Sequence, residues 1–265
     1  MNIAAGRPAP RVLVAIPAFN EAPTIASVVE RVRAEAPELD LLVIDDGSSD
    51  PTGAVLRRSG VATATHLANL GYGRALQTAI TYAERTGYDA LITFDADGQH
   101  RASDLRPLLA AFTEGGYDLL IGSRFDARRG YAAEPLVRRL GMRLFSTLIA
   151  LFTGRRIYDT SSGLKVIGRR VFPVLRARPF VDFHAEALVY LIESGYTVGE
   201  SPIAVEPRRH GESMYSPLSA LKYPMKVSFL ILIGALEGRL GRRRAQTPAR
   251  SGRIERVEEQ MRHGG

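Results

Sequence analysis

Two aspartates one residue apart, Asp95 and Asp97, are the side chains in this sequence best suited to chemistry. They follow the apolar run 90–94, which predicts a buried strand, and they precede Gly98. Residues two apart on an extended strand point to the same side, so the two carboxylates are expected to repel each other there. A divalent cation that prefers oxygen ligands, Mg²⁺ or Mn²⁺, relieves the repulsion and keeps positions open for phosphates. Taken alone, the stretch supports an acidic turn bent at Gly98 equally well.

Short apolar runs without alternation recur along the chain and predict strands buried on both faces. They cover residues 12–16, 41–44, 90–94 and 119–121, and residues 61–66 predict a further short strand. Stretches with apolar residues at helical spacing separate them. This alternation predicts an α/β fold, with a mostly parallel sheet and helices on both faces.

Polar clusters follow four of the predicted strands. They lie at residues 17–21, 45–50, 95–99 and 122–124. Ligands of open α/β sheets bind beyond the carboxyl ends of the strands. We therefore expect the four clusters to meet in one crevice, a regularity that unrelated surface turns would not explain.

Composition limits the function further. The chain has 265 residues, no cysteine and a net charge of +7, which rules out disulfides and thiolate metal sites. The sequence has neither a signal-peptide pattern nor an uncharged apolar run of about 18 residues, so we expect no spanning helix. Much of the positive charge lies near the C-terminus, where it could meet nucleic acid or an anionic membrane. We interpret residues 245–265 as a solvated, disordered tail and expect no nucleic-acid partner.

Two further segments, 135–153 and 216–244, predict amphipathic helices. The centre of the second, residues 227–236, is apolar and about half the length that spans a bilayer. Basic residues flank it on both sides, at Lys222, Lys226, Arg239 and 242–244. Such a segment can lie in the membrane interface or pack on the domain or on a twin subunit. We favour the membrane because two such segments occur in one chain.

Five short motifs occur in an order that resembles family 2 glycosyltransferases. They are Pro-Ala-Phe-Asn-Glu at 17–21, Asp-Asp-Gly-Ser at 45–48, Asp-Ala-Asp-Gly-Gln-His at 95–100, Gly-Ser-Arg-Phe at 122–125 and Arg-Arg-His-Gly-Glu-Ser at 208–213. Within that family the sequence looks most like the dolichol-phosphate mannosyltransferase and polyprenyl-phosphate glycosyltransferase group. The resemblance covers roughly residues 11–215, after a flexible lead-in at 1–10.

The resemblance implies a GT-A fold, which is a Rossmann-like sheet. It implies an inverting transfer of a sugar from a nucleotide-sugar, GDP-mannose or a UDP-sugar, to polyprenyl or dolichyl phosphate. The enzyme would depend on Mg²⁺ or Mn²⁺ and would lie on the cytoplasmic face of the cell membrane as a peripheral protein of cell-envelope synthesis. A homo-oligomer is left open.

The resemblance also assigns residues. It places the donor nucleotide-sugar against Pro17, Phe19, Glu21, Ile44, Asp46, Asp95, Ala96, Arg124, Arg208 and Ser213. It places the metal and the diphosphate leaving group at Asp95, Asp97 and Gln99. The residues it assigns to catalysis are Asp97, Arg124, Asp159 and Arg208. A plain turn-capping role for Asp159 is an equally good interpretation.

Three departures from the family pattern leave the donor undecided. Phe19 stands where Tyr is common, Met214 where eukaryotic synthases carry Lys, and His184 where mannosyltransferases often have an acid.

The chemistry of the acceptor separates the hypotheses. A phosphate monoester has a second pKa of about 6 and is already a nucleophile at neutral pH, so it needs no Ser-His-Asp arrangement. A soluble or polysaccharide acceptor would require a general base. A non-catalytic nucleotide-sugar-binding protein is the third alternative, and the intact Asp95 and Asp97 pair argues against it.

Overall fold

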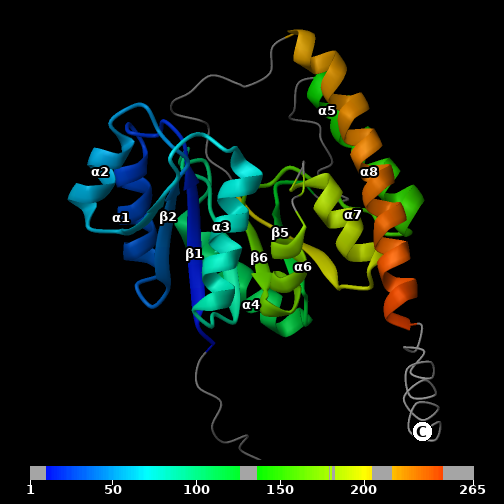
Figure 1. The fold of residues 1–265 in the computed structure, drawn as a ribbon, viewed down its shortest axis with the longest axis horizontal. Helices are drawn as coiled ribbons and strands as arrows, with labels where there is room; N and C mark the ends of the chain where they lie inside the picture. The colour runs from blue at the N-terminus through cyan, green and yellow to red at the C-terminus, as the bar shows by residue number, and fades with distance from the viewer. Residues whose placement is uncertain (1–9, 126–135, 179, 181–182, 205–216, 247–265) are drawn as a thin grey trace, which may run out of the picture.

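The computed structural model describes residues 10–125, 136–178, 180, 183–204 and 217–246. The strands in these ranges are β1 (Val12–Ala18), β2 (Asp40–Asp45), β3 (Ala62–Thr65), β4 (Ala90–Thr93), β5 (Leu119–Ser123), β6 (Lys165–Gly168) and β7 (Val198–Pro202). The α-helices are α1 (Ile25–Glu35), α2 (Thr52–Ser59), α3 (Tyr72–Arg85), α4 (Leu105–Gly115), α5 (Leu136–Thr153), α6 (Phe172–Ala177), α7 (Ala185–Glu193) and α8 (Pro217–Gln246). Two short 3₁₀ turns are η1 (Ala102–Asp104) and η2 (Arg169–Val171). The predicted α/β fold is confirmed (Figure 1).

One sheet of seven strands runs in the order β3-β2-β1-β4-β6-β5-β7. All neighbouring pairs are parallel except those of β6, which lies antiparallel between β4 and β5. An antiparallel strand begins at the edge where its parallel neighbours end. Lys165, the first residue of β6, accordingly pairs with Thr93 of β4 and Ile121 of β5.

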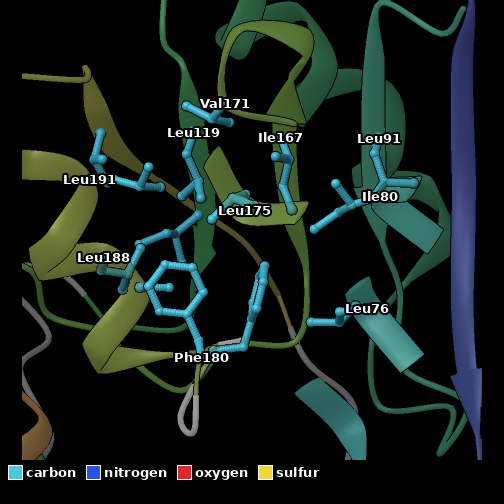
Figure 2. Packing of buried hydrophobic residues seen from close by; sticks show 14 of the residues in the cluster. Leu76, Ile80, Leu91, Leu119, Ile167, Val171, Leu175, Phe180, Leu188 and Leu191 are labelled. Carbon is cyan, nitrogen blue, oxygen red and sulfur yellow. The ribbon is translucent and has the colours of Figure 1, made fainter. Parts of the chain in front are cut away.

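Both faces of the sheet are covered by apolar layers, which explains the lack of alternation in its strands. Along β1, Leu13 and Ala15 belong to the layer beneath α3, whereas Val14 and Ile16 belong to the layer beneath α1. Figure 2 shows the first layer, where side chains from α3, α6 and α7 meet those of β4, β5 and β6. These layers hold the carboxyl ends of the strands at one edge.

Helices α5 and α8 run side by side at one end of the molecule (Figure 1). The second amphipathic segment forms a single helix, α8, of 30 residues. Its small residues Gly234 and Gly238 let it approach α7 closely. A Cβ atom on either would lie 2.9 Å or less from a backbone oxygen of Glu186 or Tyr190.

The acidic stretch departs from the expected strand geometry. β4 ends at Thr93, so Asp95 and Asp97 do not share one face of an extended strand, and that prediction is wrong. The chain turns instead, because Asp97 Oδ1 accepts the backbone N–H of Gln99 at 3.0 Å and Gly98 takes a φ of +75°. The two carboxylates therefore lie in a turn just beyond the carboxyl end of β4.

Candidate active site

The segments after β1 and β2 are locked together by Asn20. Its side-chain oxygen accepts the backbone N–H groups of Ser49 at 2.9 Å and Asp50 at 3.2 Å, and the backbone N–H of Asn20 donates to Ser48 Oγ at 3.0 Å. Asn20 has a φ of +58°, a left-handed conformation that asparagine adopts more easily than most residues. Two of the four predicted polar clusters thus form one rigid rim, and the Phe19 ring is 41% exposed beside it.

The other residues assigned to the nucleotide occupy different environments. Pro17 is half-buried within β1, and the Ile44 side chain is fully buried in the apolar layer beneath α3. Glu21 Oε2 accepts a hydrogen bond from the Thr24 hydroxyl at 2.8 Å just before α1.

Asp46 organises the loop that leads into α3. Its carboxylate, 4% exposed, accepts the backbone N–H groups of Leu70 at 3.0 Å and Gly71 at 2.7 Å. The ring of His66 bridges Asp46 Oδ1 at 2.6 Å and the Thr78 hydroxyl at 2.9 Å. The side chain of Asp46 therefore positions the segment after β3, and His66 links Asp46 to α3.

Asp95 lies at the centre of the edge, between β4 and the start of β6. Its Oδ2 is 3.3 Å from Nε2 of the buried His100, and it packs so closely on Gly163 that a Cβ there would lie 1.8 Å from Oδ2. Burial raises the pKa of Asp95, but the hydrogen bond from His100 and nearby positive charge, to which Lys165 contributes, outweigh it and leave the pKa below its usual value. Asp95 is thus held ionised by its polar surroundings.

The metal that the family resemblance implies fits this donor set only in part. The two carboxylates and the Gln99 amide are oxygen ligands of the kind that Mg²⁺ and Mn²⁺ prefer. Within the described ranges, however, no three His, Cys, Asp or Glu side chains converge on a point that could hold a metal. The residues present suit an ion whose remaining positions are filled by the phosphates of a substrate.

Arg124 and Asp159 form a two-pronged ion pair just beyond β5. Arg124 Nε donates to Asp159 Oδ2 at 2.7 Å and Nη2 donates to Oδ1 at 2.8 Å. The backbone N–H of Arg124 also donates to Oδ2, at 3.0 Å. Asp159 is fully buried, whereas the Arg124 side chain is 17% exposed. The structure therefore pairs two of the residues that the resemblance assigns to catalysis.

A residue that the sequence analysis missed, Glu200 of β7, holds this pair in place. Its carboxylate accepts the backbone N–H groups of Tyr158 at 2.8 Å and Asp159 at 2.7 Å, and lies 2.9 Å from the hydroxyl of Ser123. Burial raises the pKa of Glu200 and the charge of Asp159 adds to the rise, while these hydrogen bonds oppose it. A glutamate inside the short strand Val-Gly-Glu-Ser-Pro was the one signal available.

One assigned residue, Ala96, lies in the core instead of in this cluster. Ala96 is 4% exposed and belongs to the apolar layer beneath α1. Arg208 and Ser213 lie outside the described residues. A second missed residue, Lys165, is fully buried at the start of β6, and its signal was a lysine in the apolar run 164–167.

The Arg124–Asp159 pair predicts a dependence of stability on pH. Burial raises the pKa of Asp159. The hydrogen bonds and charge of Arg124 lower the pKa by more than burial raises it, so the net pKa lies below its usual value. The folded state then binds fewer protons than the unfolded state, so the stabilisation exists above the unfolded pKa of about 3.9 and is lost as pH falls through the folded value. We expect Asp159→Asn to lower the free energy of unfolding by about 3 kcal/mol at pH 6. In urea titrations the difference should shrink toward pH 3; a constant difference would contradict the ion-pair explanation.

Comparison with known proteins indicates the family of this chain. The model of Glycosyl transferase family 2 matches residues 13–175. Polyprenol monophosphomannose synthase of Mycolicibacterium smegmatis is 31% identical over 242 residues, 87% of this chain and 91% of the relative. Undecaprenyl-phosphate mannosyltransferase of Micrococcus luteus is 28% identical over 218 residues, 78% of this chain and 88% of the relative.

Solved structures share the fold. Glucosyl-3-phosphoglycerate synthase from Mycobacterium tuberculosis, in complex with Mn²⁺, UDP-glucose and phosphoglyceric acid, superposes with a TM-score of 0.61 at 20% identity, covering 85% of this chain and 80% of that one. The predicted GT-A fold is thereby confirmed. With the fold, the clusters at its strand ends and the family match in agreement, this chain belongs to glycosyl transferase family 2.

Proposed function

We propose that this glycosyltransferase moves a sugar, with inversion, from GDP-mannose or a UDP-sugar to polyprenyl or dolichyl phosphate. It would work as a peripheral protein on the cytoplasmic face of the cell membrane. Support comes from relatives named for transfer to polyprenol or undecaprenyl phosphate. It also comes from the way an exposed apolar helix joins the site.

That junction is the observation that carries the proposal. Met142 of α5 packs with Phe125 and Tyr158 in a small apolar cluster. These two aromatic residues are the chain neighbours of Arg124 and Asp159. A lipid chain lying along α5 would therefore end beside the buried ion pair, where a phosphate head group could meet the donor.

The outer surfaces of α5 and α8 are apolar. Nine of the thirteen large apolar side chains exposed in the described part of the chain lie on these two helices. They are Leu136, Leu140, Leu144, Leu151, Met225, Phe229, Leu232, Leu236 and Leu240. Those of α8 recur every three or four residues and so form a stripe along one side of the helix. Concentrated exposure of this kind marks an interaction surface, and no described helix has the length and hydropathy to cross a bilayer.

The acceptor would bring its own nucleophile. A phosphate oxygen attacks the anomeric carbon, a new C–O bond forms, and the bond to the nucleoside diphosphate breaks. Asp159 is a poor general base because its oxygens already accept hydrogen bonds from Arg124 and its pKa is lowered. This favours a phosphate acceptor over an alcohol, which would need a base.

The leaving diphosphate needs positive charge. A bound Mg²⁺ or Mn²⁺ would supply it by polarising the phosphate oxygens. Asp97 and Gln99 would hold that ion, with Asp95 placed by His100 and Gly163 behind it. Arg124 lies at the opposite side of β6 and could add charge-assisted hydrogen bonds to a phosphate through its exposed part.

The direct test is incubation with radiolabelled nucleotide sugars, Mg²⁺ or Mn²⁺, and undecaprenyl phosphate. We expect label from one donor to enter the lipid fraction in a metal-dependent way. Transfer to phosphoglyceric acid or to a sugar alcohol without any lipid product, or no transfer from any common donor, would contradict the proposal.

Two variants make the assay specific. Asp97→Asn should lower turnover by roughly 100-fold, because removing one ligand weakens stabilisation of the departing charge. Glu114→Gln, at an exposed position on α4, is the matched control and should behave as the unmodified protein.

The apolar stripe predicts membrane binding. Replacing Phe229 and Leu236 together by Gln should weaken binding to anionic phospholipid vesicles by about 100-fold, since each buried side chain contributes about 1.5 kcal/mol or more. Leu67 and Leu70, which are also exposed but lie on the loop before α3, are the matched control and are replaced by Gln in the same way. Vesicle cosedimentation measures both variants; equal loss in the two would contradict a membrane role for α8.

A further inference from the structure

A fully buried lysine stands in the middle of the site, and neither the family motifs nor the proposed function assigns it a role. Lys165 is the first residue of β6 and is 0% exposed. It is level with Thr93 of β4 and Ile121 of β5, so it lies between the donor segment after β4 and the segment after β5. Lysine is rarely buried completely, because removing its charge from water is costly unless polar groups receive it.

Two contacts with described residues help to place the Lys165 ammonium. Its Nζ donates to the backbone oxygen of Ser162, and it lies 3.1 Å from Nδ1 of His184. An ammonium has only donors, so His184 must accept at Nδ1 and carry its own proton on Nε2. The His184 ring in turn stacks on Tyr72 of α3, with centroids 5.2 Å apart. Through His184 the Lys165 ammonium is thus held at the start of α7 and, by the stacking on Tyr72, at the start of α3.

The same cation acts on both halves of the site. Lys165 is level with Thr93, two residues before Asp95, and it follows Gly163, on which Asp95 packs, by two residues. It also contributes to the lowered pKa of Asp159, after the larger effect of Arg124. Asp95 lies beside the predicted diphosphate position, and Asp159 lies beside the surface that would deliver the acceptor.

We propose that Lys165 is a fixed internal cation that offsets the negative charge of the substrate phosphates at the centre of this site. The inference deepens the proposed function and rests on it. Donor diphosphate and acceptor phosphate repel each other as they approach, and a preorganised charge in a water-poor interior is more effective than one in solvent. Lys165 is buried, so its charge acts on the substrate phosphates through the Asp95 and Asp159 carboxylates. Lys165 is therefore a positioning residue.

Removing the charge of Lys165 is expected to change the affinities of the site for cations and for anions in opposite directions. Lys165→Met keeps the approximate length of the side chain and removes the charge. We expect metal-free inorganic pyrophosphate to bind about tenfold more weakly, and Mn²⁺ alone to bind as tightly as before or more tightly. Calorimetry measures the first and electron paramagnetic resonance the second. A general structural defect would weaken both, so weakening of both would overturn the proposal.

Two further variants keep the test decisive. Lys165→Gln retains hydrogen-bond donors for Ser162 and His184 without the charge, so it should match Lys165→Met and can replace it if that variant does not fold. Recovery of pyrophosphate affinity in Lys165→Gln would overturn the electrostatic role. Arg169→Met, beyond the far end of β6, removes an exposed cation paired with Asp89 and should leave both affinities unchanged.

The binding measurements contain neither lipid nor sugar. If label fails to enter lipid while the opposite-sign changes are found, the acceptor assignment is wrong and the role of Lys165 at the diphosphate stands. If lipid transfer is found without those changes, the proposed function stands and the role of Lys165 falls.

Discussion

Charge buried at the carboxyl edge of the sheet must be matched by opposite charge, and this requirement organises the molecule. Asp159 and Lys165 are both fully buried, which would be costly for either one alone. Arg124 donates two parallel hydrogen bonds to Asp159, and Glu200 accepts the backbone N–H of Asp159. The resulting network links β5, β6 and β7 just where the strands end.

The antiparallel strand β6 makes this arrangement possible. Every parallel strand brings its last residue to the binding edge, whereas β6 brings its first, so the chain can deliver Asp159, Gly163 and Lys165 to that edge in one short segment. The close approach of Gly163 to Asp95 then couples this segment to the turn after β4. Helix α5 ends just before the segment, which connects the exposed apolar surface to the buried charges.

The sequence predicted the parts of the fold that follow from local pattern. Apolar runs and strand-end motifs identified the α/β sheet and the family, because each depends on a few consecutive residues. Pairings between distant residues were not predictable in this way. No local sequence pattern around Glu200 predicts its hydrogen bonds with Tyr158 and Asp159. The position of Lys165 in the site could be inferred only after β6 was known to be antiparallel to its neighbours. The geometry of Asp95 and Asp97 was misjudged because the strand ends at Thr93, one residue before the end of the apolar run, and the chain then turns.

The central claim is that the turn after β4 and the start of β6 together form the diphosphate site of a family 2 glycosyltransferase. A crystal structure of the protein with Mn²⁺ and a nucleoside diphosphate tests it most directly, through the anomalous signal of the metal. We predict an ion bonded to the Asp97 carboxylate and to the diphosphate, with Lys165 still buried between Asp95 and Asp159. A metal and diphosphate bound elsewhere, or a diphosphate bound with no contact to this turn, would contradict the account.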